Sequence, residues 1–330
     1  MIRLPLAVLL VLALAAARPA RAIDSAAGTS AAQFLKLGQG SSRAMALGGA
    51  YVALAEGSDA ISWNPAGLAV TQQRELAFSW YRGMQGVQGV DTRGFLPAYI
   101  GYAQPMGRTT WGANAAYLTD NGFDVRDVNG VPQQNSNVSV RDGFGTIGLA
   151  RSFWYEKLFL GASLRAIHED VAGSSHDSLA GDFGAMLKPT GALSLGFAVQ
   201  NFGARAADVA RVTRGGAALR LNDFMTVTGE LSKASDDGVQ FAIGGEFQLP
   251  EEYLDVGQLT MRIGYRNVDS YGQSFSGQLK TLNLDQTSGI SFGLGVYTSQ
   301  AFGYGVALDY AFVPYGALGT VDQLAFKLKF

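Results

Sequence analysis

Short segments in which apolar and polar residues alternate follow one another about fourteen times between Glu75 and Phe330, the spacing expected of a membrane β-barrel. From Tyr304 to Phe312, the large residues Leu308 and Tyr310 fall on one face of an extended strand, and the small residue Ala307 falls on the other. Alternation of this kind predicts β-strands that have one apolar face.

The amino terminus has the features of an export signal. Arg3 precedes an apolar run from Leu4 to Ala17, and Ala20-Arg21-Ala22 is a small-x-small cleavage site. That run is too short to span a membrane as a helix. In lipid every backbone polar group needs a partner, so a chain that enters a bilayer without spanning helices must close its sheet. We therefore predict an all-β transmembrane antiparallel barrel of about 14 strands, with a soluble secreted β-protein as the alternative.

The lengths of the predicted connections favour the barrel, because bacterial barrels have short periplasmic turns and longer outer loops. The predicted outer connections are Gly83 to Arg93, Thr119 to Arg141, Glu169 to Ser178 and Val268 to Ser288, whereas connections such as Pro105 to Thr109 are brief. This pattern predicts a signal peptide at residues 1–22, a plug segment at 23–74 and a barrel at 75–330, in the outer membrane of a Gram-negative-type bacterium.

The segment before the barrel does not alternate. Thr29 to Gly38 and Ser58 to Trp63 are predicted to form short helical pieces, and Asn64-Pro65 is a typical helix start. An apolar, glycine-rich segment at this position predicts a plug, or hatch, folded into the barrel lumen, and a periplasmic arm or a lid beneath the barrel is the alternative. Trp63, Asn64, Pro65 and Gly67 are the predicted plug motif.

Composition excludes several function classes. The net charge of −2, without a cluster of basic residues, argues against a nucleic-acid partner. His168 and His176 stand beside acidic residues, but they lack a third ligand and a nucleophile, so a solvated loop is favoured over a metal or catalytic site. We predict no catalytic residue, metal or cofactor. The charges predicted to face the lumen are of both signs and are expected to neutralise one another; they are Arg165, Asp182, Glu230, Glu246, Arg262, Arg266 and Asp309.

The last segment alternates up to a terminal aromatic residue. Phe326, Leu328 and Phe330 fall on one face, which is predicted to contact membrane lipid. We also predict that these three residues form the signal by which barrel-insertion machinery recognises the chain.

Four segments resemble one known family of outer-membrane proteins. They are Gly28 to Gly38, Arg43 to Ala53, Trp63 to Leu68 and Asp309 to Gly319. These segments are similar to the PorV/PorQ family, which is related to the FadL-type (OmpP1/FadL) transporters. The resemblance implies a fourteen-stranded barrel with an amino-terminal hatch.

The resemblance leaves two functions open. FadL-type relatives pass hydrophobic molecules through a hatch and a lateral opening in the wall. PorV-type members act as outer-membrane scaffolds or shuttles that bind secreted proteins in type IX secretion. We expect a FadL-like transport barrel for hydrophobic small molecules, with the PorV-like scaffold as the alternative, and the sequence identifies no ligand-binding residue.

Overall fold

The computed structural model describes residues 40–85, 96–126, 131–171, 173–204, 209–254, 257–267, 289–301, 303–314 and 320–330. Within these ranges no helix is long and apolar enough to cross a bilayer. The predicted signal peptide, the predicted helix from Thr29 to Gly38 and the loop from Val268 to Ser288 lie outside the described residues.

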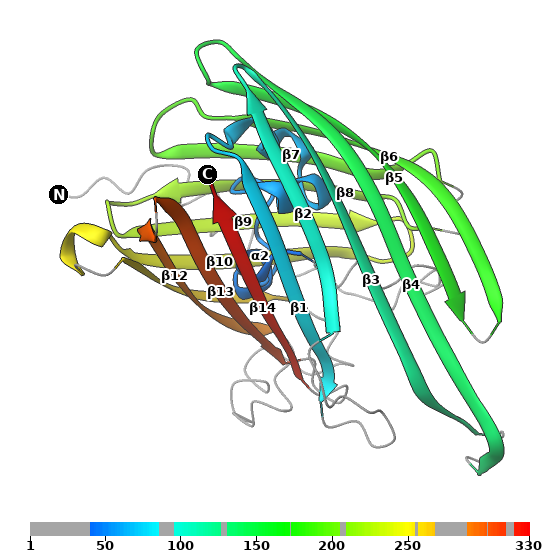
Figure 1. Cartoon of the computed structure of the whole chain (residues 1–330). Coiled ribbons are helices and arrows are strands. Elements are labelled where there is room, and N and C mark those ends of the chain that lie inside the picture. The colour runs from blue at the N-terminus through cyan, green and yellow to red at the C-terminus, as the bar shows by residue number, and fades with distance from the viewer. Residues whose placement is uncertain are drawn as a thin grey trace.

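Fourteen antiparallel strands form one closed barrel, in which each strand pairs with its sequence neighbours and β1 pairs with β14 (Figure 1). The predicted all-β barrel is therefore confirmed. The strands are β1 (Glu75–Gln85), β2 (Leu96–Met106), β3 (Thr109–Arg126), β4 (Pro132–Phe153), β5 (Leu158–Val171), β6 (Ser174–Leu187), β7 (Leu193–Phe202), β8 (Val212–Arg220), β9 (Met225–Ala234), β10 (Val239–Leu249), β11 (Gln258–Arg266), β12 (Ile290–Ala301), β13 (Tyr304–Pro314) and β14 (Thr320–Lys329).

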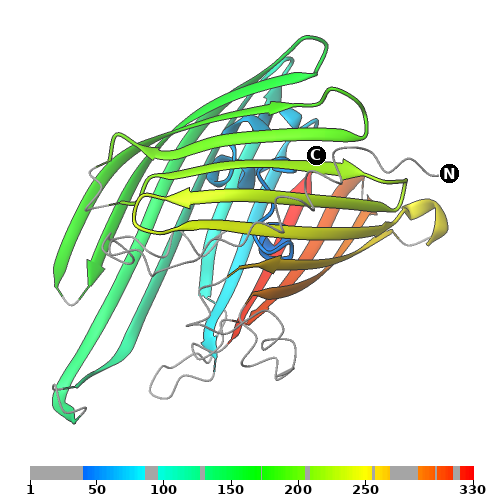
Figure 2. The same cartoon turned by 180° about the vertical axis from the view of Figure 1, so that it is seen from behind.

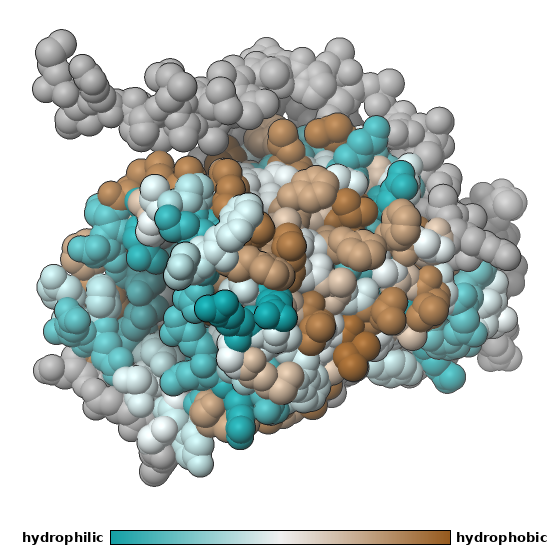
Figure 3. Space-filling model, turned by 90° about the horizontal axis from the view of Figure 1, so that it is seen from above, coloured by the Kyte–Doolittle hydropathy of each residue, from teal (hydrophilic) through white to brown (hydrophobic). Residues whose placement is uncertain are grey.

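Side chains alternate between the two faces of the wall, as the sequence predicts. On β13 the exposed fractions of Leu308 and Tyr310 are 46% and 36%, whereas those of Ala307 and Ala311 are 9% and 0%. Large apolar residues are exposed on the outside of most strands, and the view from above shows a broad brown hydrophobic region beside a teal hydrophilic one (Figure 3). A closed wall with an apolar exterior satisfies its backbone internally and is suited to lipid.

The predicted bounds of two outer loops are wrong, because strands occupy most of the residues that were assigned to these loops. β3 continues to Arg126 and β4 begins at Pro132, within the predicted loop from Thr119 to Arg141. Similarly, β5 continues to Val171 and β6 begins at Ser174. Polar residues extend these strands because the antiparallel ladder is made by backbone groups and does not require apolar side chains. β3 to β6 consequently reach far beyond the neighbouring strands at the outer end (Figures 1 and 2).

Residues 40–71, here called the inner segment, lie within the barrel. They form α2 (Ser42–Ala46) and the 3₁₀ helices η2 (Ser58–Ser62) and η3 (Pro65–Val70), and another 3₁₀ helix, η4 (Glu251–Tyr253), lies between β10 and β11. Views from opposite sides both show the blue helices enclosed by strands (Figures 1 and 2). The predicted helical turn at Ser58 and helix start at Asn64 are confirmed.

Candidate functional site: the lumen and its inner segment

Most of the inner segment is inaccessible to solvent. Leu47, Tyr51, Ile61 and Leu68 are fully buried, although the segment contains only 3 short helical pieces. α2 contacts β11 to β14, whereas η3 contacts β3 to β6. Helices this short have little stability of their own. Their conformation therefore depends on packing against the barrel wall.

Inward-facing glycines of the wall receive the inner segment. A Cβ atom at Gly264 would collide with the backbone of Leu47 and Gly48, and one at Gly161 would collide with the backbone of Pro65 and Ala66. We call the set of such residues the glycine seat. It consists of Gly112, Gly148, Gly161, Gly184, Gly196, Gly216, Gly244, Gly264 and Gly293. At Gly161, Gly196 and Gly264 the backbone of the inner segment approaches the wall closely, and at the other six positions its side chains lie within 3.3 Å of the ideal Cβ, so a larger residue would displace the inner segment.

Asn64 connects three parts of the site. Its Nδ2 donates to the carbonyl oxygen of Val52 at 2.8 Å and to that of Ala185 on β6 at 3.1 Å. Its Oδ1 accepts from the backbone N–H of Ala66 at 3.2 Å and thereby caps η3. Asn64 is fully buried, so its loss would leave backbone groups without partners.

The other residues of the predicted plug motif lie around Asn64. Trp63 meets the ring of Tyr51 edge-on, with 5.9 Å between ring centroids, and the guanidinium of Arg214 lies 4.7 Å from a ring centroid of Trp63. Pro65 occupies the first turn of η3, where its fixed φ suits the helix. A Cβ at Gly67 would collide with the carbonyl of Ala55. The structure thus brings the four residues together, while their role as a moving hatch stays a prediction.

Ion pairs join the inner segment to β10, β11 and β13. The Nε and Nη2 atoms of Arg43 donate to the two carboxylate oxygens of Glu246, both at 2.9 Å, and Nη1 donates to Glu56 at 2.5 Å. Arg262 lies 2.7 Å from Glu246 and 2.5 Å from Asp309. These groups form a chain of alternating charge. This chain of charges runs from the inner segment into the wall. The sequence predicted charges of both signs in the lumen, but it did not predict which of them form pairs.

A second set of charges holds the middle of the inner segment. Glu230 on β9 accepts from the backbone N–H groups of Tyr51 and Val52, at 2.9 and 2.8 Å, and pairs with Arg214 at 2.8 Å. Between β5 and β6, Arg165 pairs with Asp182 at 2.9 Å. Six charges that were predicted to face the lumen therefore have oppositely charged partners: Arg165, Asp182, Glu230, Glu246, Arg262 and Asp309. The expected neutralisation is confirmed for these six.

Burial and ion pairing shift the pKa values of the inner segment's charged groups. Burial would lower the pKa of Arg43, but Glu246 and Glu56 raise it well above its ordinary value. Burial would raise the pKa of Glu56, yet Arg43 lowers it below 4.5. Burial raises the pKa of Asp59, and Lys327, whose Nζ lies 3.0 Å away, opposes that shift. Arg43 is thus held as a cation between two carboxylates.

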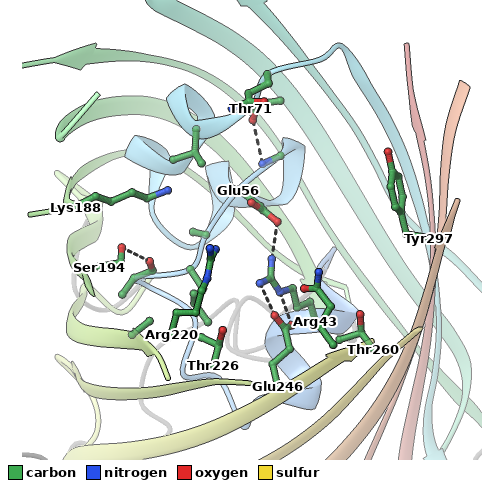
Figure 4. Close-up of a pocket in the computed structure, with 18 of the residues that line it drawn as sticks. Arg43, Glu56, Thr71, Lys188, Ser194, Arg220, Thr226, Glu246, Thr260 and Tyr297 are labelled. Carbon is green, nitrogen blue, oxygen red and sulfur yellow. Dashed lines mark hydrogen bonds and ion pairs between the residues drawn. The ribbon is translucent and has the colours of Figure 1, made fainter. Parts of the chain in front are cut away.

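The lumen differs in polarity on the two sides of the inner segment. Toward the outer end, Tyr99, Phe144 and Ile167 belong to one buried apolar cluster, and Val313 and Val321 belong to another. The end that holds the carboxyl terminus and the short turns is the periplasmic end in bacterial barrels. There a cavity of about 1180 Å³ lies between the inner segment and the wall, and its lining is largely polar and charged (Figure 4).

The predicted assembly residues lie on the outside of β14. Phe330 is 44% exposed and meets Tyr304 edge-on, while its backbone N–H and carbonyl pair with Arg74 at 3.0 and 3.1 Å. Phe330 therefore helps to close the barrel between β1 and β14. Its role as an assembly signal stays a prediction.

The histidines do not form a metal centre. His168 and Asp177 lie opposite each other on β5 and β6, with 2.7 Å between Nδ1 and Oδ1, and both side chains are exposed. Across the described part of the chain, no group of three His, Cys, Asp or Glu residues is placed to hold a metal ion.

Comparison with known proteins gives fold neighbours but no sequence relatives. No protein-family model matches the chain, and no curated protein matches it by sequence. The structure is similar to the toluene transporter TbuX of Ralstonia pickettii, with a TM-score of 0.60, 14% identity, and coverage of 87% of this chain and 96% of TbuX.

Two further transporters show the same likeness. The toluene transporter TodX of Pseudomonas putida gives a TM-score of 0.56 with 13% identity, covering 87% of this chain and 96% of TodX. A FadL homologue of Pseudomonas aeruginosa gives a TM-score of 0.53 with 12% identity, covering 87% of this chain and 97% of the homologue. These comparisons give no support for the PorV/PorQ resemblance. The chain therefore shares the fold of these transporters, and in this chain that fold is a closed barrel of fourteen antiparallel strands.

Proposed function

We propose that this protein carries hydrophobic small molecules across a bacterial outer membrane. The observation that carries this proposal is an inner segment packed against a glycine seat, in a barrel that shares its fold with toluene transporters. In a barrel built only as a scaffold, the same inner segment would serve as a seal. Residues 1–22 are proposed to be a cleaved export signal.

Transport requires the inner segment to move or to shape a conduit. The apolar clusters at the outer side can receive a hydrophobic molecule, and the inner segment separates them from the periplasmic cavity. The glycine seat contacts the inner segment closely near α2 and also near η3. We therefore expect displacement of α2 or of η3 to be the step that limits flux.

Uptake of a labelled hydrophobic compound tests the function directly. Cells that lack the protein are compared with complemented cells for uptake of toluene and of a long-chain fatty acid. Lower uptake of at least one compound in the deleted strain supports transport. Unchanged uptake of both compounds, with secreted proteins lost from the cell surface, would instead favour the PorV-like scaffold.

A disulfide tests whether the inner segment moves. The chain has no cysteine, and an ideal Cβ at Gly244 lies 2.9 Å from the Cβ of Leu47, so Leu47→Cys with Gly244→Cys can be linked after small adjustment. Oxidation of this pair is expected to abolish uptake, and reduction to restore it. As a control, Leu308→Cys with Phe326→Cys links β13 to β14 on the outside and should leave uptake unchanged.

A further inference from the structure

The periplasmic cavity contains charged residues that differ in whether they have ion-pair partners. Of its carboxylates, Glu56 and Glu246 pair with Arg43, and Asp309 pairs with Arg262. Glu75 accepts from Ser58 and has Lys327 at 3.9 Å. These four carboxylates are thus neutralised or hydrogen-bonded by neighbouring groups, and the other two of the lining, Glu156 and Asp223, are exposed.

Four cations of the same cavity have no ion pair among the residues that the structure describes; they are Lys157, Lys188, Arg220 and Lys329. Lys188 follows β6 and Arg220 ends β8, and both line the cavity. Figure 4 shows their side chains in the space between the wall and the inner segment. Among the residues that the structure describes, no ion pair involves either side chain. The whole lining holds seven cations and six carboxylates, so a small positive excess remains in the cavity.

Lys188 is also partly removed from water. Its Nζ lies 5.4 Å from the ring centroid of Phe159. Burial lowers the pKa of Lys188, Glu56 opposes the shift, and the like charge of Arg220 adds to it. An anion bound between the two cations would offset both the burial and the repulsion.

Apolar side chains line the cavity together with these cations. Leu54 and Val70 come from the inner segment, and Met186 and Leu193 come from β6 and β7. An inorganic anion would gain nothing from these groups, whereas an organic anion could bury its apolar part against them. Arg220 can hold a carboxylate with two parallel hydrogen bonds, and Lys188 acts as a point charge.

We propose that Lys188 and Arg220 form a binding site for a small organic carboxylate that carries an aromatic or short aliphatic group. The site opens to the periplasmic end and needs no movement of the inner segment. It therefore goes beyond the proposed transport of hydrophobic molecules. The purified barrel can bind its ligand even if no flux occurs.

Calorimetric titration of the purified full-length protein in detergent tests this site. Benzoate is the probe, benzyl alcohol is its neutral counterpart, and inorganic phosphate is the anion without an apolar group. Benzoate is expected to bind at least tenfold more tightly than either of the others. Equal affinity for benzyl alcohol would overturn the role of charge, and equal affinity for phosphate would overturn the organic ligand class.

Variants then locate the site. Lys188→Gln with Arg220→Gln is expected to weaken benzoate binding at least tenfold, whereas Lys188→Arg with Arg220→Lys should retain it within threefold. Lys157→Gln, which removes an exposed cation of the same cavity rim, is the matched control and should change affinity less than twofold. The heat-dependent shift in gel migration reports whether each barrel is folded. Unchanged binding in the folded double glutamine variant would overturn the proposal.

Discussion

The two sides of the wall hold the inner segment by different interactions. On β3 to β7 the contacts are uncharged: Asn114 donates to Ser62 at 2.9 Å, Ser194 donates to the carbonyl of Ala53 at 2.7 Å, and Gln200 donates to the carbonyl of Ser62. On β9, β10 and β14, Glu230, Glu246 and Lys327 bind the inner segment through charge. The uncharged side should therefore respond to changes in volume, and the charged side to changes in charge and pH.

Removing Glu246 should have the largest effect, because Arg43 and Arg262 would both lose a buried partner. We expect Glu246→Gln to lower the free energy of unfolding by roughly 3–5 kcal/mol, measured by denaturant titration of the barrel in detergent. Glu252→Gln, at an exposed position beside β10, is the control and should change it by less than about 0.5 kcal/mol. A loss below about 1 kcal/mol for Glu246→Gln would show that the charged side does not hold the segment.

The outside of the wall provides the next largest effect. Leu308→Arg places a cation toward lipid and should cost roughly 2–4 kcal/mol of unfolding free energy in a bilayer. Ala307→Arg points into the periplasmic cavity, where water and Asp309 are near, and should cost less. Equal costs at the two neighbouring positions would contradict the assigned facing of β13.

A single methyl group tests the uncharged side. Gly161→Ala places a Cβ against the backbone of Pro65 and Ala66 and should cost roughly 1–3 kcal/mol of unfolding free energy, by the same titration. Gly145→Ala on β4 is the matched control, since no atom lies within 4 Å of its ideal Cβ. If both variants were equally stable, the glycine seat would not be a close contact.

The smallest expected effect is the pH dependence of the pair between Arg43 and Glu56. The pKa of Glu56 is lowered in the folded state. The contribution of this carboxylate to stability is therefore present above pH 4.5 and is lost as the pH falls through the lowered pKa. Glu56 is 45% exposed, so solvent screening limits this contribution to below about 1 kcal/mol. The melting temperatures of the protein and Glu56→Gln should differ at pH 7 and converge in acid. A difference that stayed constant from pH 7 down to the acid limit of the folded protein would argue against this pair.

Local sequence patterns predicted the parts of the fold that depend on local chemistry. Alternation identified the strands and the facing of Leu308 and Ala307 because side chains of a strand must point to opposite faces. Asn64 before Pro65 predicted the start of η3 because the cap and the fixed φ act within a few residues. The ends of β3 and β4 were not predicted, since their polar outer parts are stabilised by pairing with each other rather than by side-chain type.

The sequence by itself determined that this chain forms a closed barrel with small residues facing inward, because the bilayer permits only a few ways to pair every backbone group. Only the tertiary structure decided which glycines receive the inner segment and which carboxylate neutralises which cation. Arg43 and Glu246 are separated by 203 positions in the chain. Lys188 and Arg220 share a cavity although Lys188 follows β6 and Arg220 ends β8. Such partnerships arise from closure of the wall around the inner segment, and no local pattern encodes them.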